Sequence, residues 1–245
     1  MDQQSFDMSF LGGMGVFFGR VIEFIPILLH ALPLTLFLTF VAGLFGLLIG
    51  TIGGINLNSR NWLLSKPTAL YTFLFRGTPL LVQLYLIYQG VGQLLPNLPV
   101  HDTFLWPYLR EGLWYALVAL SLNQGAYTAE VIRGAIKSVG RGQLEAAQAI
   151  GMSSNQILMR ITLPLAFRQC LPILTNDLII LLKSTALAST ITVMEIMGTA
   201  RELQRSLNLS LEPLVAAGII YFVVVLIMTK SISHFERHFT RYRSN

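Results

Sequence analysis

Three polar side chains, Asn123, Tyr127 and Glu130, interrupt an apolar stretch at spacings of i, i+4 and i+7. At this spacing they share one face of a helix. A carboxylate can bind an ammonium or guanidinium group, and an amide and a phenol can orient it by hydrogen bonds. The stripe therefore predicts the lining of a substrate route. An ion pair of Glu130 with Arg133, one turn away, or a position near the membrane surface is the alternative.

A second polar group follows about 50 residues later. Lys183, Ser184 and Thr185 could bind a carboxylate, and we predict that they also line the route, although a lysine that only reaches the membrane surface is an equal alternative. Glu195 in "TVMEIMG" is a further pathway candidate that could instead face the outer aqueous side. For Asp177, a hydrogen bond between helices is favoured over a role as substrate ligand.

Residues 145 to 166, "EAAQAIGMSSNQILMRITLPLA", form the most hydrophilic long segment. Gly151 can end one helix in the left-handed conformation, and Ser153 with Gln156 fits a capping box that starts the next. A helix-turn-helix can bind DNA. The second helix, however, has few basic residues beyond Arg160, so we expect no nucleic-acid partner. A knob that docks on a soluble partner is favoured over a bland amphipathic loop.

Composition identifies the elements that must position these groups. Of 245 residues, 53% are hydrophobic and only 12% are charged, about half the charge of a typical soluble domain. The composition therefore predicts an all-α integral membrane protein with about five transmembrane helices. We place the spans at about 24–55, 77–95, 113–132, 163–182 and 214–232, with a cytoplasmic loop at about 138–162. Residues 185–200 could be a re-entrant segment or a sixth span.

Loop charge predicts the orientation. One set of alternate loops holds 11 of the 17 basic residues, and cytoplasmic loops are enriched in Lys and Arg. The N-terminus is therefore expected outside and the C-terminus inside. The close spacing of Gly43, Gly46 and Gly50 predicts tight helix packing, either within this chain or against a partner.

Other chemistry has little support in the sequence. The chain has no GxxxxGK[ST] loop, no GxSxG elbow and no HExxH helix, so neither nucleotide binding nor a membrane-embedded hydrolase is expected. His234 and His238 have a metal-ligand spacing, but they lack a carboxylate on the same face, and we expect no metal site. The single Cys170 excludes an intramolecular disulfide.

The segment at 145–164 resembles the signature of permease subunits of binding-protein-dependent ABC importers. The matching residues are Glu145, Ala146, Ala147, Gly151, Ile161, Leu163 and Pro164. "RGTPLLVQLYLIYQG", "SLNQGAYTAEVIRGAIKSV" and "LLKSTALAS" are similar to the polar-amino-acid branch of that family. Within the family the chain resembles the histidine/lysine-arginine-ornithine permease subunits most, and opine permeases and other amino-acid permeases are similar to a lesser degree.

This resemblance implies a type I importer permease fold in a bacterial inner membrane. It implies that the seven signature residues couple the chain to a cytoplasmic ATPase dimer. It further implies a second permease subunit, identical or related, and a periplasmic amino-acid-binding protein. ATP and Mg²⁺ would belong to the ATPase subunits, and this chain would bind no cofactor and catalyse no reaction. Membrane lipid is the remaining partner.

The substrate is expected to be a polar, preferably basic, amino acid or an opine, because Glu130 and Glu195 suit a cation. The alternative function is an autonomous carrier or channel for small polar solutes. A carrier usually has more spans or an internal inverted repeat, neither of which the sequence shows.

Overall fold

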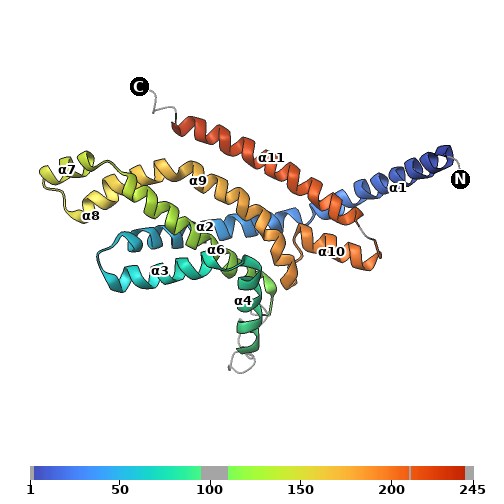
Figure 1. Cartoon of the computed structure of the whole chain (residues 1–245), viewed down its shortest axis with the longest axis horizontal. Helices are drawn as coiled ribbons and strands as arrows, with labels where there is room; N and C mark the ends of the chain where they lie inside the picture. Colours follow the sequence, from blue (N-terminus) through green and yellow to red (C-terminus); the bar gives the residue numbers. More distant parts are fainter. Residues whose placement is uncertain (1–2, 95–109, 210, 241–245) are drawn as a thin grey trace.

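The computed structural model describes residues 3–94, 110–209 and 211–240, without the side chains of 3–13, 93 and 235–240. Within these ranges the regular elements are helices (Figure 1). They are α1 (Gln3–Leu29), α2 (Leu32–Asn58), α3 (Trp62–Gly77), α4 (Leu80–Leu94), α6 (Gly112–Ser138), α7 (Arg141–Ala149), α8 (Ser154–Ile157), the π-helix η2 (Leu158–Thr162), α9 (Leu163–Ser184), the 3-10 helix η3 (Thr185–Ile191), α10 (Ile196–Ser206) and α11 (Glu212–Thr240).

The centre of the fold is the pair α2 and α6. Glycines of α2 face α6 so closely that a Cβ added at Gly46 would lie 2.6 Å from Cγ of Gln124, and one added at Gly50 would collide with Thr128. Gly43 faces Leu178 of α9 in the same way. The glycine spacing therefore serves packing within this chain, where small residues let helix backbones approach.

The expected first span at 24–55 is two helices. The break lies at His30 and Ala31, so Pro26 stands in the last turn of α1 and Pro33 in the first turn of α2. Proline has no N–H and its ring clashes with the carbonyl four residues earlier, so a helix continuing through Pro33 would be strained. Residues of α1 and α11, with Ile196 and Ala200 of α10, form a second core.

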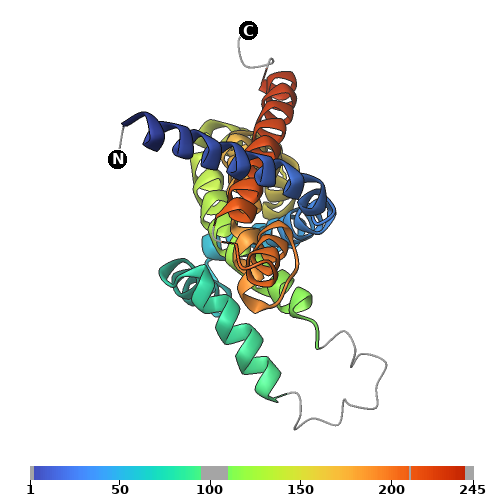
Figure 2. The same ribbon diagram turned by 90° about the vertical axis from the view of Figure 1, so that its right-hand side faces the viewer.

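The expected second span at 77–95 corresponds to α4, which begins at Leu80 rather than at Gly77. Gly77 closes α3, and α4 leaves α3 at an angle of 109°. Figures 1 and 2 both show α4 standing away from the bundle. Its last expected residue, Leu95, lies outside the described residues.

The remaining expected spans correspond to single helices. Residues 113–132 lie in α6, 163–182 in α9 and 214–232 in α11. Residues 185–200 contain η3, a turn and the start of α10 rather than one helix. In the part of the chain described, three helical stretches are long and apolar enough to cross a membrane, or four if α3 and α4 count as one. The polar stripe keeps α6 out of this set, so the number of five spans stays a prediction.

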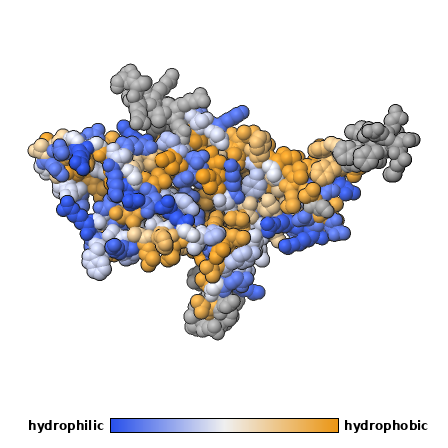
Figure 3. All heavy atoms as spheres, in the orientation of Figure 1, coloured by the Kyte–Doolittle hydropathy of each residue, from blue (hydrophilic) through white to orange (hydrophobic). Residues whose placement is uncertain are grey.

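The two ends of the bundle carry different helices. The α2–α3 connection and α7 with α8 gather at one end, and α10 lies toward the other (Figure 1). Figure 3 shows hydrophilic residues over both regions and hydrophobic residues along much of α1. The end with α7 and α8 is called the coupling end below. Its basic residues agree with the predicted cytoplasmic side, which remains a prediction.

Candidate functional site

The coupling end presents the segment 145–164 as a projecting helix-turn-helix. Gly151 has φ +82, and nothing lies within 4 Å of a Cβ added there, so backbone conformation rather than space requires glycine. Ser153 and Gln156 form the predicted capping box, with Ser153 N donating to Gln156 Oε1 at 2.9 Å. The turn between α7 and α8 is therefore rigidly defined.

The seven signature residues divide between two faces of this segment. Ala147 and Leu163 are buried, and Ile161 is half-buried. The exposed members are Glu145, Ala146, Gly151 and Pro164. Buried members hold the segment on the bundle, while the exposed ones offer one carboxylate beside small side chains and open backbone.

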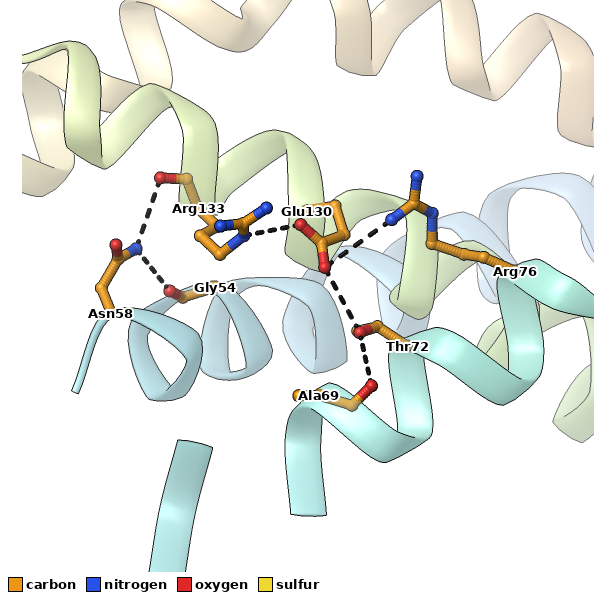
Figure 4. Close-up of polar contacts among 7 residues, drawn as sticks. All are labelled: Gly54, Asn58, Ala69, Thr72, Arg76, Glu130 and Arg133. Carbon is orange, nitrogen blue, oxygen red and sulfur yellow. Dashed lines mark hydrogen bonds and ion pairs between the residues drawn. The ribbon is translucent and has the colours of Figure 1, made fainter. Parts of the chain in front are cut away.

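Glu130 is the centre of an ion-pair cluster between α3 and α6 (Figure 4). Its Oε2 accepts a bond from Arg133 Nε at 2.6 Å, and its Oε1 lies 3.6 Å from Arg76 Nη1. Thr72 Oγ1 donates to the same Oε1 at 3.3 Å. Its carboxylate is thus already compensated, and of the alternatives considered the structural ion pair is present.

Tyr127 is exposed, and the guanidinium of Arg76 lies over its ring, 5.6 Å from the ring centroid. Arg76 therefore bridges α3 to two side chains of α6. Such a cation–π contact adds about 0.5–1 kcal/mol at an exposed site.

Asn123 contributes to a different contact at the α3–α4 bend. Its Nδ2 donates to Gln83 Oε1 at 2.9 Å, and Gln83 Nε2 donates to the carbonyls of Phe75 and Thr78 at 2.7 and 3.0 Å. Gln83 is buried and satisfies backbone carbonyls that the break between the two helices exposes. The sequence analysis did not single out Gln83. The one feature that could have indicated it is a polar amide side chain within the apolar stretch "PLLVQLYLIY".

The second polar group does not form one site with the first. Lys183 is exposed, whereas Ser184 Oγ and Thr185 Oγ1 donate to carbonyls of α9 at 2.9 and 2.7 Å. Thr185 is buried and lies against Tyr221. These hydroxyls stabilise the passage from α9 to η3, so in this conformation they are not free for a substrate carboxylate.

Glu195 is completely buried, so the expectation that it faces the outer aqueous side was wrong. Its Oε1 accepts from Gly198 N at 2.9 Å and caps the start of α10. Its Oε2 accepts from the hydroxyl of Tyr221 and, at 3.5 Å, from Thr35 Oγ1. Neither Tyr221 nor Thr35 could be paired with Glu195 from spacing, because all three lie on different helices.

Asp177 is half-buried, and one of its carboxylate oxygens lacks a partner among the described residues. Its Oδ2 is buried and has no hydrogen-bond partner among the described residues. The predicted hydrogen bond between helices is therefore absent for this atom. A carboxylate inside a membrane helix usually faces a route or a partner, which returns Asp177 to the candidate substrate ligands.

A metal site has no support in the described part of the chain, where no group of three or more His, Cys, Asp or Glu side chains gathers. His234 is exposed, and the side chain of His238 lies outside the description.

Residues 42–241 match the family described as "Binding-protein-dependent transport system inner membrane component". The chain belongs to this family. It is therefore an inner-membrane permease subunit of an ABC importer, which favours the importer over the autonomous carrier. A binding protein and an ATPase accompany permeases of this kind.

Named relatives are similar over most of their length. The octopine transport system permease protein of Rhizobium radiobacter is 44% identical over 213 residues, which cover 85% of this chain and 84% of that protein. The nopaline transport system permease protein of Agrobacterium fabrum is 40% identical, covering 86% and 87%. The arginine ABC transporter permease protein of Haemophilus influenzae is 36% identical, covering 88% and 93%.

Solved structures agree on the fold. A crystal structure of an amino acid ABC transporter with histidines superposes with a TM-score of 0.76 and 34% identity, covering 89% of this chain and 96% of that one. The MetNI methionine ABC transporter in an inward-facing form superposes with a TM-score of 0.71 at 20% identity, covering 89% of this chain and 98% of that one, which supports the fold alone.

Proposed function

We propose that this permease imports a basic amino acid or an opine and is driven by an ATPase dimer that docks on α7 and α8. The observation that carries the proposal is the projecting segment at the coupling end, with Glu145 exposed beside Ala146. Small side chains let a partner's backbone approach. The carboxylate can pair with a positive charge on the partner and so fix the position in which the two surfaces dock.

The basic substrate rests on two lines of support. The relatives named above are permeases for octopine, nopaline and arginine. Within the chain, Glu130 and Glu195 are occupied by other side chains, but Asp177 Oδ2 has no partner among the described residues. Asp177 thus replaces the two glutamates as the preferred ligand for a substrate cation.

The remaining partners follow from this assignment. A second permease subunit, identical or related, completes the route, and a periplasmic amino-acid-binding protein delivers the substrate at the end that carries α10. Membrane lipid surrounds the apolar helices. ATP and Mg²⁺ are bound and hydrolysed by the ATPase subunits, while this chain binds no cofactor and has no catalytic site.

The coupling role is tested by comparing Glu145→Arg with Glu202→Arg. Both residues are exposed glutamates, but Glu202 lies on α10 rather than on the coupling segment. Each variant is captured from native membranes in mild detergent, and the retained ATPase is measured. Reversing the charge at the docking surface should lower retention about tenfold, equivalent to about 1.4 kcal/mol.

The control should retain the ATPase as the parent does. Equal retention by both variants would reject the coupling role of Glu145. If the parent retains no ATPase in a detergent that preserves other membrane complexes, the importer assignment loses its main support.

A further inference from the structure

A groove runs between α6 and α9 at the coupling end. It encloses about 640 Å³ and is lined by Glu130, Gly134 and Ser138 of α6 and by Gln169 and Ile173 of α9, among others. This volume lies within the range of small-molecule sites. None of these lining residues belongs to the coupling segment.

The polarity of the groove limits what can fill it. The single hydroxyl hydrogen of Ser138 is shared between two acceptors, Gln169 Oε1 on α9 and the carbonyl of Ala135, which lies 2.8 Å from Ser138 Oγ. Carboxylate, hydroxyl and amide groups facing hydrocarbon cost free energy, so polar walls within membrane helices normally face a partner or a water-filled cavity. Lipid is therefore a poor occupant.

The groove is not a tight binding site for cations, because its one carboxylate is already paired. The carboxylate of Glu130 is compensated by Arg133 and Arg76. The exposed amide of Gln169 offers both a donor and an acceptor. A wall of this kind can solvate the ammonium and carboxylate groups common to all amino acids, without holding a particular side chain. Conduction requires such weak binding, because a substrate must also leave.

The groove also lies in line with Asp177. Gln169, Ile173 and Asp177 follow one another at intervals of four residues, which places them along one face of α9. Along this face the amide of Gln169 is nearest the coupling end, and the carboxylate of Asp177 is farthest from it. A substrate released from Asp177 would therefore meet the groove next.

We propose that the α6–α9 groove is the exit half of the amino-acid route and that it accepts amino acids as a class, with no selection among side chains. This inference rests on the proposed import function. It assigns selectivity to deeper groups and to the binding protein, and it gives Ser138 and Gln169 a role that the sequence did not indicate.

The test introduces one cysteine at a time into a Cys170→Ala parent, which lacks the chain's own thiol. Gly134→Cys places a probe in the groove, and Gly218→Cys is the control on α11. Nothing lies within 4 Å of a Cβ added at either glycine. Both glycines are exposed. Gly134 lies two residues beyond the expected span 113–132 and Gly218 lies within the expected span 214–232, so protection by amino acids, rather than the labelling rate alone, identifies the groove as part of the route.

Complexes in open membrane sheets are treated with a trimethylammonium methanethiosulfonate reagent, alone and with L-arginine or L-glutamine. The thiol introduced by Gly134→Cys should react about tenfold faster than the thiol introduced by Gly218→Cys, because the reactive thiolate forms in water and not in hydrocarbon. Either amino acid should slow labelling of the groove thiol to the same extent. Labelling should also reduce arginine uptake by the Gly134→Cys complex.

Each alternative result is decisive. A groove thiol that reacts no faster than the control thiol on α11 would mean that the groove is covered, which overturns the inference. Fast labelling that neither amino acid slows would overturn its place in the route, and protection by arginine alone would overturn the lack of selection. Failure of the proposed function is seen separately, as a complex with Cys170 intact that imports no arginine, because Cys170 is itself a lining residue of the groove.

Discussion

Glu130 and Glu195 show two ways in which the same side chain is accommodated in one helical protein. The side chain of Glu130 is 20% exposed and faces two guanidinium groups, whereas Glu195 is fully buried and faces two hydroxyls and a backbone N–H. The first arrangement depends on charge that water and salt can screen. The second depends on hydrogen bonds that water cannot replace. Burial, rather than formal charge, thus decides how much each carboxylate contributes to stability.

The largest effect is expected from Glu195→Ala. The change leaves the Tyr221 hydroxyl, the Thr35 hydroxyl and Gly198 N without the acceptor that they share, at about 1 kcal/mol each or about 3 kcal/mol in total. Thermal unfolding of the purified complex in detergent measures the loss. Glu202→Ala, an exposed change on the same helix, should leave the midpoint unchanged. Equal midpoints for the two variants would contradict the role of Glu195 in joining α2, α10 and α11.

Asp177→Asn should not lower the stability as Glu195→Ala does, because the Oδ2 atom of the Asp177 carboxylate has no partner to lose among the described residues. We expect the stability to stay equal or to rise by up to about 2 kcal/mol, since a carboxylate oxygen buried without a partner is itself a cost. Uptake of arginine should nevertheless fall, with a raised KM. Unfolding and uptake are measured on the same preparation, with the exposed Asn176→Ala as the matched control. A variant that is destabilised yet imports normally would show that Asp177 is structural.

The smallest effect is expected at Glu130. A double-mutant cycle of Glu130→Gln and Arg133→Gln should give a coupling of about 0.5 kcal/mol, because Arg133 is 38% exposed. Raising the salt concentration should reduce this coupling. The same cycle with Glu195→Gln and Tyr221→Phe should not respond to salt. If the coupling energy between Glu130 and Arg133 did not depend on salt, the distinction between the surroundings of Glu130 and those of Glu195 would be lost.

Much of the fold could be predicted, because long apolar periodicity dominates its signal. Residues 163–182 lie in α9 and 214–232 in α11, and the turn at Gly151 has the left-handed backbone expected of it. The break at His30 and the bend after Gly77 were not predicted. Both regions remain apolar across the break, so hydropathy alone cannot reveal where the backbone changes direction.

The candidate site was less predictable than the fold. Spacing along one helix correctly placed Tyr127 and Glu130 on one face, but it could not show that Arg76 of another helix approaches both. Glu195 was misplaced because burial depends on packing against Thr35 and Tyr221, far away in the chain. Contacts between distant helices carry no local periodicity, and they decide which polar groups remain free.

The close packing of the α2 glycines on α6 has a mechanical consequence. Because Gly46 and Gly50 bring the backbones of α2 and α6 into contact, neither helix can bend or slide without the other. The coupled pair then acts as a stiff lever, with α7 attached at the end of α6 through Val139 and Gly140. If the ATPase docks on α7 as proposed, we expect a push there to rotate α2 and α6 together instead of straining a single helix.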